Sequence, residues 1–368
     1  MDTENPRIII SGGGTGGHIY PAIAIANALR EISPGTQVLF VGALGKMEME
    51  KVPKAGYGIV GLPIAGLQRS LSPSNLLFPF KLVRSLWKAR QVIREFNPHV
   101  AVGVGGFASG PLLQMASLAG IPTLIQEQNS YAGVTNRLLS AKASRICVAY
   151  PGMEKFFPKE KILLTGNPVR KDIIDISGKK ETALAHFGLS GSRKTLFVMG
   201  GSLGARSINE SIESSLPLLT GQDIQVIWQT GKLFTDRARQ TIDQLQLGHL
   251  VKAFDFIYEM DLAYAAADAI VSRAGALSVS EICLAGKPAI LVPYPYASED
   301  HQTSNAQVLV SEQAALLVRD SEAGGQLGQK AVELIENEEL RKTLSENCRL
   351  LGFPDAAVRI ASEVLRLA

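Results

Sequence analysis

The sequence predicts an α/β protein with two parallel sheets, one in each half of the chain. Short apolar segments alternate with helical stretches throughout, a pattern typical of parallel sheets covered by helices. An order of strand, glycine turn and helix begins at residue 7 and begins again at residue 194. The length of 368 residues is too great for one ordinary core, so we expect two domains.

The expected strands come from the apolar segments, taken in chain order. The first half contains 7–11, 37–42, 100–104, 123–126 and 145–149, and the second half contains 194–199, 224–229, 250–253, 269–272 and 289–293. The pattern pauses at 165–170, where Pro168 cannot donate to a strand ladder. We therefore expect domains at 1–166 and 167–353, with a final helix at about 354–368 that packs back on the first domain.

Composition excludes several classes of protein. The chain is 46% hydrophobic and 19% charged, and its net charge of +3 is too small to indicate nucleic-acid binding. The three cysteines are scattered without metal-ligand spacing, which favours a reducing compartment. The polar start of the chain does not resemble a secretion signal. The uncharged segment 100–126 has the length of a membrane span, but glycines and prolines interrupt it, so a strand, loop, helix and strand explain it better.

The first glycine loop raises a question about its ligand. Gly12, Gly14 and Gly17 match the G-x-G-x-x-G spacing of a dinucleotide site. Such a site needs an acidic residue near the end of the next strand, and the next acid, Glu48, lies in the mixed charge run 46–51. We interpret that run as a solvated helix face, so a nicotinamide site is disfavoured. His18, at the mouth of the loop, either exchanges a proton near neutral pH or hydrogen-bonds the loop.

Glycine loops also follow two later strands. The loops at 12–17, 103–110 and 200–204 together predict a phosphorylated ligand; the alternative is that the glycines merely end strands. Within 267–288, Gly275 turns the chain and a helix is expected from about Ser278. Glu281 then either closes a capping box with Ser278 or accepts hydrogen bonds from ribose hydroxyls.

An amphipathic helix is expected within 76–93. Its apolar residues fall at helical spacing beside several basic residues, as an interfacial helix requires. The alternative is that the apolar stripe packs on the sheet. The side chains predicted to face a membrane are Phe80, Lys81, Arg84, Trp87 and Lys88.

Several motifs appear in the order found in a known family. They are Gly-Gly-Thr-Gly-Gly-His at 13–18, Glu-Gln-Asn at 127–129, Gly-Asn-Pro-Val-Arg at 166–170, Gly-Gly-Ser-Leu-Gly-Ala at 200–205, Arg-Ala-Gly-Ala-Leu-Ser-Val-Ser-Glu at 273–281 and His-Gln at 301–302. Over essentially its whole length the chain resembles the MurG family, the bacterial N-acetylglucosaminyltransferases of peptidoglycan synthesis. His301 and Leu203 depart from the family's pattern.

The resemblance implies a GT-B fold, two Rossmann-like domains around a cleft. It implies inverting transfer of N-acetylglucosamine (GlcNAc) from UDP-GlcNAc to the C4 hydroxyl of the muramoyl sugar of lipid I, an undecaprenyl-pyrophosphate glycolipid. The residues it implies for the donor are Ala276, Leu277, Ser278, Glu281 and Gln302, with the backbone of Ile257 for uracil and Ser202 and Arg170 for the phosphates or sugar. Asn129 with Thr15, Gly16 and Gly17 is expected where donor and acceptor meet.

The reaction needs a base and a means of stabilising the departing UDP. His18 is the candidate base and Glu127 its rival. The chain has no Asp-x-Asp pair to hold a metal on the diphosphate, so we expect no metal and no cofactor, with helix N-termini and Arg170 stabilising UDP instead. The partners expected are UDP-GlcNAc, lipid I, an anionic inner-membrane surface on its cytoplasmic side and other proteins of wall synthesis. The competing interpretations are a UDP-GlcNAc 2-epimerase and a non-catalytic sugar-nucleotide sensor.

Overall fold

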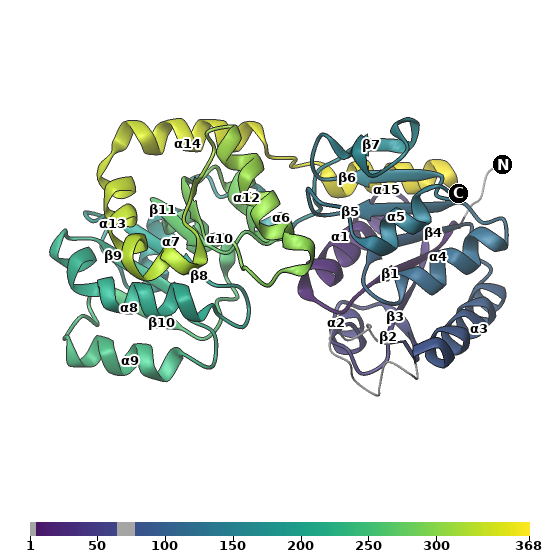
Figure 1. Ribbon diagram of the computed structural model, residues 1–368, viewed down its shortest axis with the longest axis horizontal. Coiled ribbons are helices and arrows are strands. Elements are labelled where there is room, and N and C mark those ends of the chain that lie inside the picture. The colour runs from purple at the N-terminus through teal and green to yellow at the C-terminus, as the bar shows by residue number, and fades with distance from the viewer. Residues whose placement is uncertain (1–4, 65–77) are drawn as a thin grey trace. The chain divides into compact units, whose positions relative to one another are not determined.

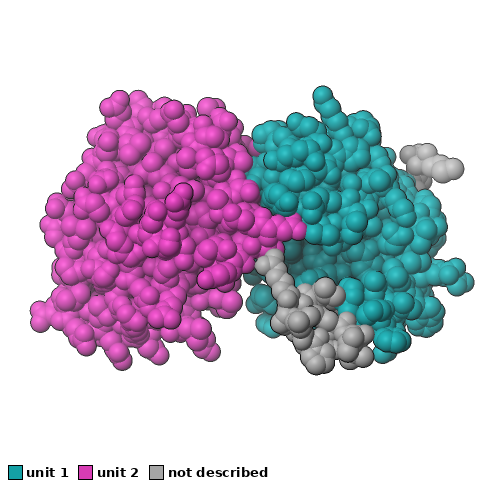
Figure 2. Space-filling model, in the orientation of Figure 1, with its two compact units in different colours: residues 1–169, 355–368 teal, residues 170–354 magenta. Residues whose placement is uncertain are grey.

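The computed structural model describes residues 5–64 and 78–368. The chain divides into two compact units, coloured separately in Figure 2. Unit 1 contains residues 1–169 and 355–368, and unit 2 contains residues 170–354. The sequence analysis places the corresponding boundaries after residues 166 and 353.

Unit 1 is a parallel α/β domain (Figure 1). Its described residues form a seven-stranded sheet in the order β3-β2-β1-β4-β5-β6-β7, in which every pairing is parallel. The strands are β1 (Arg7–Gly12), β2 (Gln37–Ala43), β3 (Gly58–Leu62), β4 (Val100–Gly105), β5 (Thr123–Glu127), β6 (Arg145–Val148) and β7 (Ile162–Leu164). The helices are α1 (Gly16–Ile32), α2 (Glu48–Lys54), α3 (Phe78–Phe96), α4 (Ser109–Leu118), α5 (Val134–Ser140) and α15 (Ala356–Leu367).

The last helix, α15, belongs to the core of unit 1. Ile360 and Val364 are fully buried in the same apolar cluster as Ile19 and Ile25 of α1. Arg145 Nε donates to Glu363 Oε1 at 3.1 Å and ties the same helix to β6. Helix α15 therefore shares one apolar core with α1, although the two helices lie far apart in the sequence.

Unit 2 has the same architecture. Its sheet, in the described residues, has six strands in the order β10-β9-β8-β11-β12-β13, again all parallel. The strands are β8 (Thr195–Met199), β9 (Gln225–Gln229), β10 (Val251–Phe254), β11 (Ala269–Ser272), β12 (Ala289–Leu291) and β13 (Leu316–Leu317). The helices are α6 (Lys171–Ile174), α7 (Lys180–Phe187), α8 (Arg206–Gly221), α9 (Thr235–Gln244), α10 (Met260–Ala266), α11 (Ala276–Ala285), α12 (His301–Ser311), α13 (Ala323–Glu336) and α14 (Glu338–Leu350).

Each sheet reverses its strand order around its first strand. β1 pairs with β2 on one side and β4 on the other, and β8 pairs in the same way with β9 and β11. Ligands of open α/β sheets bind outside the carboxyl ends of the strands at such a switch point. The two predicted Rossmann-like sheets are therefore confirmed, and the loops that leave β1 and β8 are the first places to look for a site.

The uncharged segment 100–126 folds as β4, α4 and β5, as the sequence predicts. In the described part of the chain, no helix has both the length and the apolar character needed to cross a membrane.

Candidate active site

The glycine loop after β1 leads directly into the first turn of α1. Thr15 is the N-cap, in extended backbone, and its carbonyl accepts the first helical hydrogen bonds, from His18 N at 3.1 Å and Ile19 N at 3.2 Å. The amides of Gly16 and Gly17 precede that first bond, so they have no acceptor inside the helix. They form an N-terminal edge suited to an anion.

His18 is held by the loop that precedes it. Its Nδ1 lies 3.0 Å from Gly13 O and 3.4 Å from Thr15 Oγ1. A carbonyl oxygen can only accept, so Nδ1 carries the proton in the neutral ring and Nε2 is the basic nitrogen. The ring packs on Gly105 at the end of β4, where a Cβ would lie 2.5 Å from the His18 Cδ2. Hydrogen bonding to the loop therefore engages Nδ1.

Glu48 is not on a solvated helix face, and that prediction is wrong. The residue is only 1% exposed. Its Oε2 accepts from Gly14 N at 2.8 Å, and its Oε1 accepts from Ala43 N at 2.9 Å. The charge pattern of 46–51 misled because Glu48 turns inward at the start of α2, whereas Glu50, two residues later, is exposed and pairs with Lys54.

Glu127, at the end of β5, is a buried carboxylate surrounded by donors. Its Oε1 accepts from Asn129 N at 3.1 Å and Asn129 Nδ2 at 3.4 Å, while its Oε2 accepts from Gly133 N at 3.0 Å and Asn136 Nδ2 at 2.8 Å. Burial raises the pKa of Glu127, and these hydrogen bonds act in the opposite direction. Both oxygens therefore hold the loop that carries Asn129.

The ends of β4 and β5 bring this loop close to the histidine. β4 lies between β1 and β5 in the sheet. His18 packs on Gly105, and Gln128 Nε2 donates to the adjacent Val104 O at 2.5 Å. His18 and the 127–129 segment thus share the carboxyl edge of the sheet in unit 1.

In unit 2, α11 begins earlier than the sequence predicts. Gly275 is the N-cap and its carbonyl accepts from Val279 N at 2.9 Å. Ser278 therefore lies inside the first turn, and the predicted capping box with Glu281 is wrong because its serine is not at the N-cap. The amides of Ala276, Leu277 and Ser278 precede the first helical bond. They form a second anion-binding edge.

Glu281 lies one turn further along α11 and is buried. Tyr264 donates its hydroxyl proton to Glu281 Oε2 at 3.0 Å, and Arg170 Nε lies 3.7 Å from Oε1. Burial raises the pKa of Glu281, and the positive charge of Arg170 opposes that shift. Glu281 is therefore a positioned hydrogen-bond acceptor with one neighbouring cation.

Gln229, which was not predicted from the sequence, links two segments that carry predicted site residues. It ends β9 and is buried. Its Nε2 donates to Gly201 O at 3.2 Å, and its Oε1 accepts from Ile257 N at 2.9 Å. One amide side chain therefore joins the 200–204 loop, which carries the exposed Ser202, to the segment predicted to bind uracil. A polar residue that directly follows the apolar run Val226–Trp228 was the available signal.

Gln302 lies in the first turn of α12, where it accepts from Tyr294 N at 2.9 Å through Oε1. The preceding residues, Glu299 and Asp300, have φ values of +55° and +52°, a left-handed conformation that costs energy in residues with a Cβ. His301 Nδ1 donates to Ser298 O at 2.7 Å. Gln302 is thus held at the end of a strained turn.

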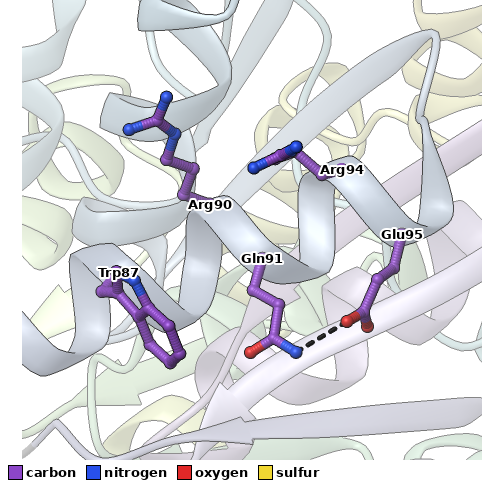
Figure 3. Close-up of a pocket in the computed structure, with 5 residues that line it drawn as sticks. All are labelled: Trp87, Arg90, Gln91, Arg94 and Glu95. Atoms are coloured by element: carbon purple, nitrogen blue, oxygen red, sulfur yellow. Dashed lines mark hydrogen bonds between the residues drawn. The ribbon is translucent and has the colours of Figure 1, made fainter.

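Helix α3 has one packed face and one exposed face. Ala89, Val92 and Ile93 are buried against the core, whereas Phe80 is 71% exposed and Trp87 is 69% exposed. Figure 3 shows Trp87 with the two arginines of the next turns, Arg90 and Arg94, lining a surface pocket completed by Gln91 and Glu95. The alternative that the apolar residues of this helix pack on the sheet therefore accounts for one side of α3 only. The first residues of the predicted segment, 76 and 77, lie outside the described residues.

In the part of the chain that the structure describes, no group of three or more His, Cys, Asp or Glu side chains could hold a metal ion. The predicted site residues lie in two sets. Unit 1 contains Thr15, Gly16, Gly17, His18, Glu127 and Asn129, and unit 2 contains Arg170, Ser202, Ile257, Ala276, Leu277, Ser278, Glu281 and Gln302.

Comparison with known proteins agrees with this fold. Residues 8–148 match the glycosyltransferase family 28 N-terminal domain, and residues 195–360 match its C-terminal domain. A relative from Bacteroides fragilis named UDP-N-acetylglucosamine--N-acetylmuramyl-(pentapeptide) pyrophosphoryl-undecaprenol N-acetylglucosamine transferase is 56% identical over 98% of this chain and 96% of its own. A relative of the same name from Cytophaga hutchinsonii is 55% identical over 100% of this chain and 98% of its own.

Solved structures also have the same fold as this chain. The crystal structure of Acinetobacter baumannii MurG has a TM-score of 0.80 and 27% identity, over 98% of this chain and 99% of that one. A UDP-N-acetylglucosamine 2-epimerase has a TM-score of 0.66 at 13% identity, over 98% of this chain and 96% of that one, which shows a shared fold alone. On these similarities, the chain belongs to glycosyltransferase family 28 and, within it, to the MurG family of N-acetylglucosamine transferases.

Proposed function

We propose that this chain transfers GlcNAc from UDP-GlcNAc to the C4 hydroxyl of the muramoyl sugar of undecaprenyl-pyrophosphoryl-MurNAc-peptide, with inversion and a new β-1,4 linkage. The product would be lipid II, the disaccharide precursor of peptidoglycan. The observation that carries this proposal is the identity above 50%, over nearly the full length, to transferases named for that donor and acceptor.

Unit 2 would bind the donor. The amides at the start of α11, from Ala276, Leu277 and Ser278, suit the pyrophosphate, because unpaired N–H groups and the helix dipole both favour an anion there. Glu281 would accept from the ribose hydroxyls. Since the N–H of Ile257 already donates to Gln229, its carbonyl is the group that would accept from uracil. Ser202, Gln302 and Arg170 would contact the phosphates or the sugar.

Unit 1 would bind the acceptor and supply the base. Gly16 and Gly17, with Thr15 and Asn129, would line the place where donor and acceptor meet, and His18 Nε2 would take the proton from the C4 hydroxyl of the acceptor. The hydroxyl oxygen forms the new bond to C1 of GlcNAc as the bond from C1 to the UDP oxygen breaks, and UDP leaves with that electron pair. Glu127 is the weaker candidate base because its two oxygens already accept from Asn129, Gly133 and Asn136.

The direct experiment combines purified protein, UDP-GlcNAc and a short-chain lipid I analogue, with the disaccharide product read by mass. Product should form equally well with EDTA present, because amides and Arg170 are expected to stabilise the leaving group without a metal. Release of a new hexosamine without acceptor would indicate an epimerase, and tight binding without turnover a sensor. His18→Ala should abolish the basic-group dependence of the rate on pH; an unchanged pH profile would remove His18 from that role, and the same profile for Glu127→Ala tests its rival.

We also propose that the exposed face of α3 binds the cytoplasmic side of the inner membrane, where a lipid-linked acceptor would lie. Phe80 and Trp87 would enter the interface, while Lys81, Arg84 and Lys88 would attract anionic headgroups, each adding about 1 kcal/mol. Other wall-synthesis proteins are further proposed partners.

Replacing both Phe80 and Trp87 with serine should weaken binding to anionic vesicles in a sedimentation assay and leave UDP affinity unchanged. Leu118→Ser is the matched control, because Leu118 is similarly exposed, at 65%, on another helix of unit 1. Loss of folding in the double variant would instead indicate that the two aromatic residues are structural.

A further inference from the structure

We propose that Glu48 is a positioning residue for the base: through one shared peptide group it orients His18 and keeps its proton on Nδ1. The proposal rests on the role given to His18 above. No motif of the chain points to Glu48, and its sequence context suggests an exposed charge. The structure instead buries its carboxylate beneath the first glycine loop.

The connecting group is the peptide bond between Gly13 and Gly14. Its N–H, which belongs to Gly14, donates to Glu48 Oε2 at 2.8 Å, and its C=O, which belongs to Gly13, lies 3.0 Å from His18 Nδ1. The N–H and C=O of a planar trans peptide point in opposite directions. A carboxylate on one side therefore aims the carbonyl at the imidazole on the other.

The loop is shaped around this carboxylate. A Cβ on Gly13 would overlap the Glu48 carboxyl group, and a Cβ on Gly42 would lie 2.5 Å from Glu48 Cγ. Glu48 Oε1 is also held by Ala43 N, so the side chain is anchored at both oxygens. These two glycines make room for a residue of the chain itself.

The arrangement has an electrostatic consequence. Hydrogen bonds linked in series polarise one another in a low-dielectric interior. An anion that accepts from the Gly14 N–H makes the Gly13 carbonyl a stronger acceptor, which favours the Nδ1–H tautomer and leaves Nε2 as the base. The positive imidazolium that forms after proton transfer is stabilised by the same route. In the Ser-His-Asp triad a carboxylate does this by direct contact with the imidazole.

The test is Glu48→Gln, which keeps the shape but removes the charge and turns one acceptor into a donor. We expect kcat to fall by roughly 10- to 100-fold, the range seen when a partner behind a functional histidine is removed, with the KM for UDP-GlcNAc unchanged. The basic-group inflection of the kcat profile should move to lower pH, because the imidazolium loses a stabilising anion. Glu50→Gln is the control on the same helix, since Glu50 is exposed and bonds only to Lys54 among the contacts described.

A second measurement does not depend on activity, and its wild-type part does not depend on the variant folding. ¹⁵N NMR of the histidine ring in the wild-type protein should show neutral His18 protonated at Nδ1, and Glu48→Gln should mix the two tautomers. A wild-type ring protonated at Nε2, or a folded variant with unchanged tautomer and pH profile, would overturn the proposal. If the wild-type protein makes no disaccharide, the proposed function fails, while the NMR comparison still shows whether Glu48 sets the tautomer of His18.

Discussion

Buried polar side chains at the ends of strands hold the loops of both units. Glu127 ends β5 and gathers the donors of Asn129, Gly133 and Asn136. Gln229 ends β9 and joins two loops of unit 2. A buried group of this kind is costly to leave unpaired, so each of these side chains restricts its loop to the conformation that satisfies it.

Replacing Glu127 with glutamine should destabilise unit 1 by about 1–3 kcal/mol, because the new NH₂ faces donors that need an acceptor. The effect depends on pH with a definite sign. Burial raises the pKa of Glu127 above its unfolded value, so the stability linked to its titration is fully present below about pH 4.3 and is lost as pH rises through the folded value. The difference between wild type and variant in urea unfolding should therefore shrink as pH rises from about 4.3. Growth of the difference with pH would contradict this sign, and the exposed Glu154→Gln serves as control.

Replacing Gln229 with leucine should weaken UDP binding roughly tenfold or more. The change removes two hydrogen bonds at about 1 kcal/mol each and releases both the 200–204 loop and Ile257. Calorimetric titration with UDP measures the loss, and Gln244→Leu on the exposed side of α9 is the matched control. Unchanged UDP affinity in a folded Gln229→Leu protein would show that the link between the two loops does not matter for the donor.

Helices α1 and α11 repeat one local design. Each follows a strand, begins after a residue in extended backbone, and presents first-turn amides at the carboxyl edge of its sheet. Neither N-cap makes a side-chain hydrogen bond to its helix. The first-turn amides therefore have no acceptor within the helix or its N-cap side chain, a feature that these two helices share with most other described helices.

The amide contribution of α11 can be tested without breaking the helix. Ala276→Pro removes one N–H at the first helical position, where proline is well tolerated. Gly275 has φ −67° and ψ 145°, a conformation that a following proline accepts. UDP affinity should fall several-fold, whereas Ala276→Gly, which keeps the N–H, should bind UDP almost normally. Equal affinity in the two variants would show that this amide does not contact the phosphates.

The chain as a whole consists of two units with separate apolar cores. One core contains Trp228 and residues of α8 and α13, and those of unit 1 contain the buried faces of α1, α3 and α15. A ligand bound by residues of one unit stabilises chiefly that unit, by about 2.7 kcal/mol at 100 times its dissociation constant. UDP and the acceptor should therefore protect different residues from hydrogen exchange.

Hydrogen exchange with saturating UDP should show increased protection at the start of α11, in the 200–204 loop and around Ile257. The strands of unit 1 should exchange as they do without ligand. Protection confined to the loop after β1 would mean that unit 1 is the nucleotide-binding unit, and it would reverse the assignment of donor and acceptor.

The sequence predicted most strands because buried parallel strands are short apolar runs bounded by turn residues. It missed β3, β7 and β13, which lie at sheet edges, because these strands are short and incompletely buried. The start of α11 was misplaced by two residues, since Ser278 and Glu281 have the spacing of a capping box while Gly275 occupies the N-cap.

Alternation of strands and helices, the glycine turns and the ordered motifs were sufficient to determine the fold class and the family, and to predict the segments that carry the site. Each of these features depends on residues that lie close together in the sequence. Only the folded chain decided that Glu48 turns inward and that Gln229 joins two loops. Each of these depends on hydrogen bonds between residues that the sheet brings together from distant parts of the chain, and burial, which local sequence does not specify, makes those bonds obligatory.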